Sequence, residues 1–212
     1  MYMLPGIPRF GISLHKDLRL LEFVRTVLPE FDIICCQEVF YTLNNRKQQL
    51  IHLAQMAGFP YHATSSKPSL FFQSVTDSGL LTLSRFPIVK SEFEAYPYGV
   101  FSDSISRKGV LFTHIKIKDT DLLLFNTHMQ ASYISTDLEE VKASITSREV
   151  QFELLRDFIN VKLDLFRDEH LREPSLVMLC GDLNVDSKRN SQLMQELKRD
   201  FEAKGTILEL KD

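Results

Sequence analysis

Asp182 and Asn184 are the residues best suited to chemistry in this sequence, because a carboxylate and a carboxamide directly follow a buried strand. The apolar stretch 175–179 is bounded by turn residues, which is typical of such a strand. Residues two apart in an extended chain share one face, so both side chains project together. Polar groups there are costly unless they have a partner or a task. The alternative is a turn in which Asp182 bonds to the nearby backbone.

Two further apolar strands also end in polar residues. Glu38 follows the run 33–36 and is placed to bind a hard cation such as Mg²⁺, which takes one or two protein carboxylates and keeps several waters. His128 follows the run 123–125, and histidine can donate a proton or stabilise charge near neutral pH. A solvent-facing glutamate and a structural histidine are the alternatives for these two positions.

A polar loop over residues 101–109 is a fourth candidate. It contains hydroxyl groups, Asp103, the cations Arg107 and Lys108, and a glycine directly before a strand. Cations and hydroxyl groups of this kind can meet a phosphate. The loop lacks the spacing of a nucleotide-binding P-loop, and a solvated turn is its alternative interpretation.

The combination indicates more than any single member. If these strands share a sheet, Glu38, His128 and the pair formed by Asp182 and Asn184 converge on one cleft. A divalent cation on Glu38 would neutralise phosphate oxygens and the leaving group. Asp182 could orient or deprotonate a water, Asn184 could donate to a non-bridging oxygen, and His128 could stabilise developing charge. This chemistry is attack on a phosphodiester.

The elements that position these residues form an α/β pattern. Periodicity and turn signals predict helices over 17–28, 44–57, 137–166 and 190–204, with Asp17 as the N-cap of the first. Strands are expected over 31–36, 79–84, 88–96, 110–117, 122–126, 176–179 and 206–210. We expect one α/β domain over residues 1–212, closer to a layered sandwich than to a regular parallel array.

Composition favours an ordinary soluble protein, with 44% hydrophobic and 25% charged residues in a chain of 212. The net charge of −3 gives no overall basic field, which argues against a nucleic-acid partner. Cys35, Cys36 and Cys180 lie in apolar runs without zinc-type spacing, which indicates buried thiols of a reducing compartment. The sequence shows no signal peptide and no stretch of membrane-spanning length. A cytoplasmic or membrane-peripheral location is favoured, with secretion left open.

Four segments together resemble the endonuclease/exonuclease/phosphatase superfamily of magnesium-dependent phosphoesterases. They are residues 32–39, 78–88, 126–128 and 181–184, and they occur in the family's order. The resemblance implies a four-layered α/β sandwich, in which two packed mixed sheets are flanked by helices and the cleft lies at one rim. It also implies Glu38 as a metal ligand, His128 as a phosphate-contacting histidine, and Asp182 with Asn184 around the scissile phosphate.

Within that superfamily the chain is most similar to neutral sphingomyelinases. Residues 126–133 and 181–187 match two of their motifs, and Asp103 with Lys108 matches a loop near their active site. The implied reaction is magnesium-aided hydrolysis of sphingomyelin to ceramide and phosphocholine at a membrane surface. Asp103 and Lys108 are the implied substrate-binding residues.

Two features of the family have no match here, and they leave alternatives open. The family begins with a strand ending in a metal-binding Asn and closes with a Ser-Asp-His motif that supplies the general base. We therefore expect a chain that is incomplete at both ends, has no assignable general base and shows little activity by itself. The alternatives are a nuclease or inositol-phosphate phosphatase of the same superfamily, and a degenerate domain that is not catalytic.

Overall fold

The computed structural model describes residues 15–41, 44–65, 76–97, 99–132 and 137–185, together with the single positions 195 and 199. In chain order the elements are α1 (Lys16–Thr26), η1 (Leu28–Glu30), β1 (Ile33–Cys36), α2 (Arg46–Met56), β2 (Tyr61–Thr64), β3 (Leu81–Ser84), β4 (Ile88–Ala95), η2 (Phe101–Ile105), β5 (Gly109–Ile117), β6 (Thr120–His128), α3 (Leu138–His170) and β7 (Leu176–Asp182). Among these, no helix has both the length and the low polarity needed to cross a membrane.

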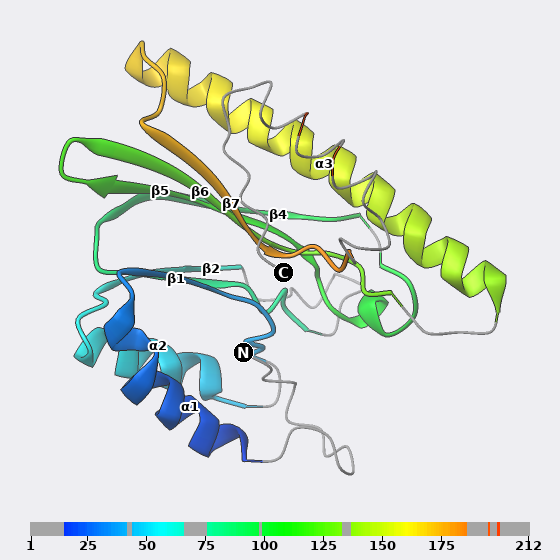
Figure 1. The fold of residues 1–212 in the computed structure, drawn as a ribbon, viewed down its shortest axis with the longest axis horizontal. Helices are drawn as coiled ribbons and strands as arrows, with labels where there is room; N and C mark the ends of the chain where they lie inside the picture. The colour runs from blue at the N-terminus through cyan, green and yellow to red at the C-terminus, as the bar shows by residue number, and fades with distance from the viewer. Residues whose placement is uncertain are drawn as a thin grey trace.

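Two stacked sheets form the centre of the molecule (Figure 1). One sheet has the order β1-β3-β2 and is antiparallel throughout its described strands. The other has the order β4-β5-β6-β7 and is mixed, because β7 runs parallel to β6. Helices α1 and α2 cover the first sheet, and the long helix α3 covers the second. These four layers confirm the expected α/β sandwich.

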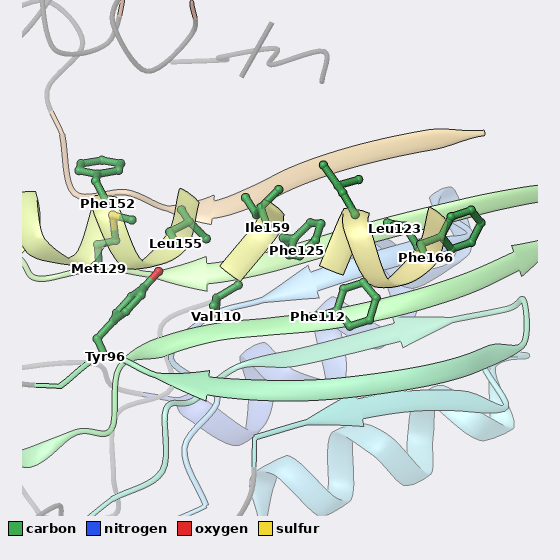
Figure 2. Close-up of a cluster of buried hydrophobic side chains, with 11 residues drawn as sticks. Tyr96, Val110, Phe112, Leu123, Phe125, Met129, Phe152, Leu155, Ile159 and Phe166 are labelled. Atoms are coloured by element: carbon green, nitrogen blue, oxygen red, sulfur yellow. The ribbon is translucent and has the colours of Figure 1, made fainter. Parts of the chain in front are cut away.

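The largest core lies between α3 and the four-stranded sheet (Figure 2). It consists of Tyr96, Val110, Phe112, Leu123, Phe125, Met129, Phe152, Leu155, Ile159, Leu163 and Phe166. The helical members recur three or four residues apart and so form one stripe of α3. Burying each large apolar side chain contributes roughly 1.5–3 kcal/mol. This packing fixes the helix that connects β6 to β7, and therefore fixes both strands that carry candidate residues.

Several sequence expectations differ from the structure. His15 precedes the first turn of α1, so the prediction that Asp17 is the N-cap is wrong. Asp17 lies inside that turn, where its carboxylate accepts a hydrogen bond from Arg46 Nε at 2.7 Å. Strand β2 was not expected, because only Ala63 of its four residues is buried and no apolar run marks it. The helix expected over 190–204 and the strand over 206–210 lie outside the described residues, apart from two helical positions.

A buried carboxylate at the start of β6 makes stability depend on pH. Asp121 accepts hydrogen bonds from His114 Nε2 at 2.8 Å, from Lys116 Nζ at 3.0 Å and from Arg172. Burial alone would raise the pKa of Asp121, but these three donors together hold it well below its usual range. A lowered folded-state pKa means that the ionised form stabilises the fold.

Replacing Asp121 by Asn is expected to lower the free energy of unfolding at pH 7 by about 1–3 kcal/mol. The difference from the wild type is full above the unfolded-state pKa of about 3.9, and shrinks as the pH falls below it. Urea unfolding between pH 7 and pH 3 measures this difference. Asp119→Asn, an exposed position in the adjacent turn, is the matched control and should have little effect. A difference for Asp121→Asn that stays constant down to pH 3 would contradict the argument.

Candidate active site

The ends of three strands meet at one rim of the sandwich. His128 is the last residue of β6 and Asp182 is the last residue of β7, and the parallel register pairs these two residues directly. Glu38 follows β1 by two residues, and both Lys108 and Asp182 affect its pKa. The structure therefore brings together three of the strand-end residues that the sequence singled out. Their catalytic roles remain predictions.

Asn126 holds the two sheets together directly beneath this rim. It is fully buried on β6, and its Oδ1 accepts a hydrogen bond from Gln37 Nε2 at 2.7 Å. Its Nδ2 donates to the backbone oxygens of Cys36 at 3.3 Å and Leu81 at 3.2 Å. Gln37 is the residue before Glu38, so these bonds fix the position of Glu38 relative to β6.

Lys108 is a buried cation at the centre of the cluster. Its Nζ lies 2.9 Å from Asp103 Oδ2 and 3.2 Å from His128 Nε2, and it also donates to the backbone oxygen of Met129. Burial lowers the pKa of Lys108, and the Asp103 carboxylate raises it. Asp103 Oδ2 also accepts the backbone N–H of Ala131 at 2.7 Å. Asp103 thus orients Lys108, and Lys108 in turn faces His128.

His128 is only 4% exposed and is uncharged at neutral pH. Burial lowers its pKa, and the nearby Lys108 cation adds to the lowering, so that the pKa is about 4. Because Nε2 faces the Lys108 ammonium, Nε2 accepts and Nδ1 carries the proton. Nδ1 is buried and has no hydrogen-bond partner within the described part of the chain. His128 can therefore act as a neutral N–H donor but not as the cation of the site.

Asp182 and Asn184 form the local turn that was the alternative interpretation, and the pair still faces the rim. Asp182 Oδ1 accepts the backbone N–H of Asn184 at 2.9 Å, and Asn184 has a left-handed backbone with φ 52°. Asn184 Nδ2 donates to the backbone oxygen of Met129 at 2.8 Å, which leaves its second N–H for another acceptor. Asp182 is exposed. The turn occupies one hydrogen-bonding position of the carboxylate and leaves the rest of it exposed to solvent.

Glu38 is a partly buried carboxylate at the rim. Burial raises its pKa, the Lys108 cation opposes this increase and the Asp182 carboxylate adds to it, so that the pKa is about 6. Within the described ranges, no three or more His, Cys, Asp and Glu side chains are grouped to hold a metal ion. This donor set does not fit zinc, which requires three or four protein ligands. It does fit Mg²⁺, which is held by one or two carboxylates and keeps several waters.

Two residues at the site were not assigned a role from the sequence. Asn126 connects the sheets, and Gln130 ties the loop after β6 to the chain before η2, since its Oε1 accepts the backbone N–H of Val100 at 2.8 Å. Both side chains are fully buried. A buried carboxamide requires partners, so the position of Asn126 at the end of an apolar run was a signal that could have identified it.

Comparison with known proteins agrees with the fold and the motifs. The sequence profile of the Endonuclease/Exonuclease/phosphatase family matches residues 12–192. The chain is 38% identical over 223 residues to a sphingomyelinase of Dictyostelium discoideum, covering 93% of this chain and 46% of that protein. It is 32% identical over 189 residues to a sphingomyelinase C of Bacillus cereus, covering 84% of this chain and 52% of that protein. The chain thus spans about half the length of these curated relatives.

Solved structures share the same architecture. A β-hairpin deletion mutant of the beta toxin from Staphylococcus aureus superposes with a TM-score of 0.71 at 18% identity, covering 94% of this chain and 69% of that chain. A beta toxin mutant with bound magnesium ions gives a TM-score of 0.68 at 18% identity, covering 86% of this chain and 62% of that chain. With the profile match over most of its length, the chain belongs to the endonuclease/exonuclease/phosphatase family.

Proposed function

We propose that this site binds Mg²⁺ through Glu38 and hydrolyses the phosphodiester of sphingomyelin at a membrane surface, giving ceramide and phosphocholine. The observation that carries the proposal is the direct pairing of His128 with Asp182, with the buried Lys108 cation beside His128. The names of the relatives support the substrate, since they include sphingomyelinases and a sphingomyelin phosphodiesterase 5 of Danio rerio that is 30% identical over 189 residues. The magnesium ions in a beta toxin structure support the metal.

Each side chain has a role that follows from its surroundings. Lys108 supplies a fixed positive charge for the phosphate, and Asp103 holds it in place. The second Nδ2–H of Asn184 is a donor for a phosphate oxygen. The Nδ1–H of His128 has no partner but is buried, so it is a donor only for an oxygen that enters the cluster. Asp182, whose carboxylate faces solvent, orients the attacking water. When bound, Mg²⁺ neutralises the charge of the phosphate oxygens and of the leaving group.

Replacing Glu38 by Gln is expected to weaken Mg²⁺ binding by about tenfold or more, since a neutral amide replaces the carboxylate ligand. Calorimetric titration of the wild type and the variant with MgCl₂ measures this change. Binding is a suitable readout because it does not require a general base. Glu30→Gln, at an exposed position of η1, is the matched control and should bind Mg²⁺ like the wild type. Equal affinities for wild type and Glu38→Gln would contradict the metal role.

The substrate is tested by turnover. Vesicles of sphingomyelin, vesicles of phosphatidylcholine and a DNA duplex with an abasic site are incubated with the chain, with Mg²⁺ or with EDTA. We expect phosphocholine release from the sphingomyelin vesicles only, and we expect EDTA to abolish it. Cleavage of the DNA without release of phosphocholine would identify a nuclease instead. Retained Mg²⁺ binding without any turnover would favour a domain that is not catalytic.

A further inference from the structure

Two thiols far apart in the sequence meet between the sheets. Cys35 of β1 and Cys180 of β7 are separated by 145 positions, and their Sγ atoms lie 3.7 Å apart. Both are free cysteines. They belong to different sheets, because β1 is an edge strand of the three-stranded sheet and β7 an edge strand of the four-stranded sheet. No ladder of backbone hydrogen bonds joins these two strands, so the thiols are a direct side-chain contact between them.

The surroundings separate this pair from the third cysteine. Cys35 and Cys180 pack against the cluster of Ile115, Leu122 and Leu124 between the sheets, and both are only partly buried. Cys36 is the next residue of β1 and therefore points to the opposite face, where it is buried under α1 and α2. The pair thus belongs to partly exposed residues, while Cys36 is enclosed by apolar side chains.

The two thiols differ in acidity. Their mutual hydrogen bond raises the pKa of Cys35 well above its usual value, and burial raises it further. The same hydrogen bond lowers the pKa of Cys180. Cys180 therefore ionises first, and the thiolate is the form that reacts with oxidants. The pair consists of one nucleophilic sulfur and one protonated neighbour in contact with it.

We propose that Cys35 and Cys180 form an oxidation site, at which a peroxide converts the thiol pair into a disulfide that joins the two sheets. The Cys180 thiolate attacks one oxygen of hydrogen peroxide, and the O–O bond breaks to give a sulfenic acid and hydroxide. The sulfur of Cys35, losing its proton, then displaces the hydroxyl group as water. In total two S–H bonds are lost and one S–S bond forms, while hydrogen peroxide is reduced to two molecules of water. This inference does not depend on the proposed function.

The disulfide would connect strands that carry the site. Cys35 precedes Glu38 by three positions, and Cys180 precedes Asp182 by two. A bond between them ties the backbone before Glu38 to the backbone before Asp182. It also closes a loop with a separation of 145 residues, which restricts the unfolded chain. The expected increase in Tm on oxidation is roughly 5–15 °C.

The pairing is tested on the full chain. The protein is treated with hydrogen peroxide, its remaining thiols are blocked with iodoacetamide, and the digest is analysed by mass spectrometry without reduction. We expect one intramolecular link between the peptide of Cys180 and the peptide of the adjacent pair Cys35 and Cys36. Because those two are neighbours, variants assign the bond: Cys36→Ala keeps the link, and Cys35→Ala and Cys180→Ala lose it. The increase in Tm should be reversed by dithiothreitol and be absent in Cys35→Ala.

Other outcomes would overturn the inference. A link that survives in Cys35→Ala and disappears in Cys36→Ala would assign the bond to the wrong neighbour. Sulfinic acid on Cys180 without any link, or a link only between two molecules, would show that the pair does not close. A Tm that falls on oxidation, or stays unchanged, would show that the disulfide does not hold the two sheets together. If Cys35→Ala folds poorly, fragmentation of the linked wild-type peptide still assigns the bond, because the neighbouring cysteine outside the disulfide carries the iodoacetamide label.

Discussion

Replacing Lys108 by Met is expected to lower the free energy of unfolding by about 3–5 kcal/mol, because one partner of a buried ion pair is removed. Asp103 loses the ammonium group 2.9 Å from its carboxylate, and the backbone oxygen of Met129 loses a donor. The same change should raise the pKa of His128 from about 4, because the Lys108 cation is one cause of its lowering. The pKa of Glu38 should rise further above about 6, since the Lys108 cation holds it down.

Urea unfolding measures the first effect, and NMR titration of the histidine side chains measures the second. Lys162→Met is the matched control, because Lys162 is also a buried lysine, with its Nζ 2.6 Å from Glu92 Oε2. The Glu92 side chain is 47% exposed, so water can solvate its carboxylate when the lysine is removed. Lys162→Met should therefore destabilise the protein less than Lys108→Met. It should also leave the pKa of His128 unchanged. An unchanged His128 pKa in Lys108→Met would remove Lys108 from the proposed phosphate site.

Replacing Gly181 by Ala is expected to destabilise the protein by about 3 kcal/mol or more, with a decrease in Tm of about 6–12 °C. Gly181 has φ +141°, and a Cβ atom there would lie 2.0 Å from the backbone oxygen of Thr127. That oxygen belongs to the neighbouring strand β6, which is held on both sides by the sheet. The clash can be relieved only by moving β6 and β7 apart, directly beside His128 and Asp182.

Gly58→Ala is the control for this prediction. Gly58 also has a positive φ, +88°, but its added Cβ would meet the flexible end of Arg85, at 2.6 Å from Nη1. The Arg85 side chain can move away, although it then loses its hydrogen bonds to the backbone oxygens of Ala57 and Gly58. Together with backbone strain of about 1–2 kcal/mol, this loss should still be smaller than that at Gly181. Thermal unfolding of both variants compares the two cases. Equal Tm values would show that the close approach of β7 to β6 is not what requires glycine at position 181.

The sequence predicted the strand ends because polar residues there interrupt clear apolar runs. Glu38, His128 and Asp182 each follow such a run, and this pattern depends only on local periodicity and burial. The resemblance of the ordered motifs to the endonuclease/exonuclease/phosphatase family then implied the four-layered architecture. The surroundings of these side chains could not be predicted in the same way. The hydrogen bond between Gln37 and Asn126 joins residues 89 positions apart. A local sequence pattern does not predict which strands of the two sheets lie opposite each other.

The electrostatic details also depend on tertiary contacts. Lys108 is in a polar loop by sequence, where a solvated cation is the ordinary expectation, but it is 4% exposed in the structure. The neutral state of His128 follows from that burial and from the position of Lys108. Long-range contacts decided both cases. Asp17 failed as an N-cap for a local reason, because α1 begins at Lys16 and His15 takes the cap position.

The carboxamide of Asn126 has a consequence for how a ligand is received. It bonds to the carbonyl groups of both β1 and β3 while its own backbone is part of β6. The two walls of the rim therefore share one rigid anchor below the cluster, and their spacing is set before any ligand arrives. A ligand that fits this fixed spacing binds with little reorganisation of the protein. A wider ligand binds more weakly, because the two sheets cannot move apart to receive it without breaking these hydrogen bonds.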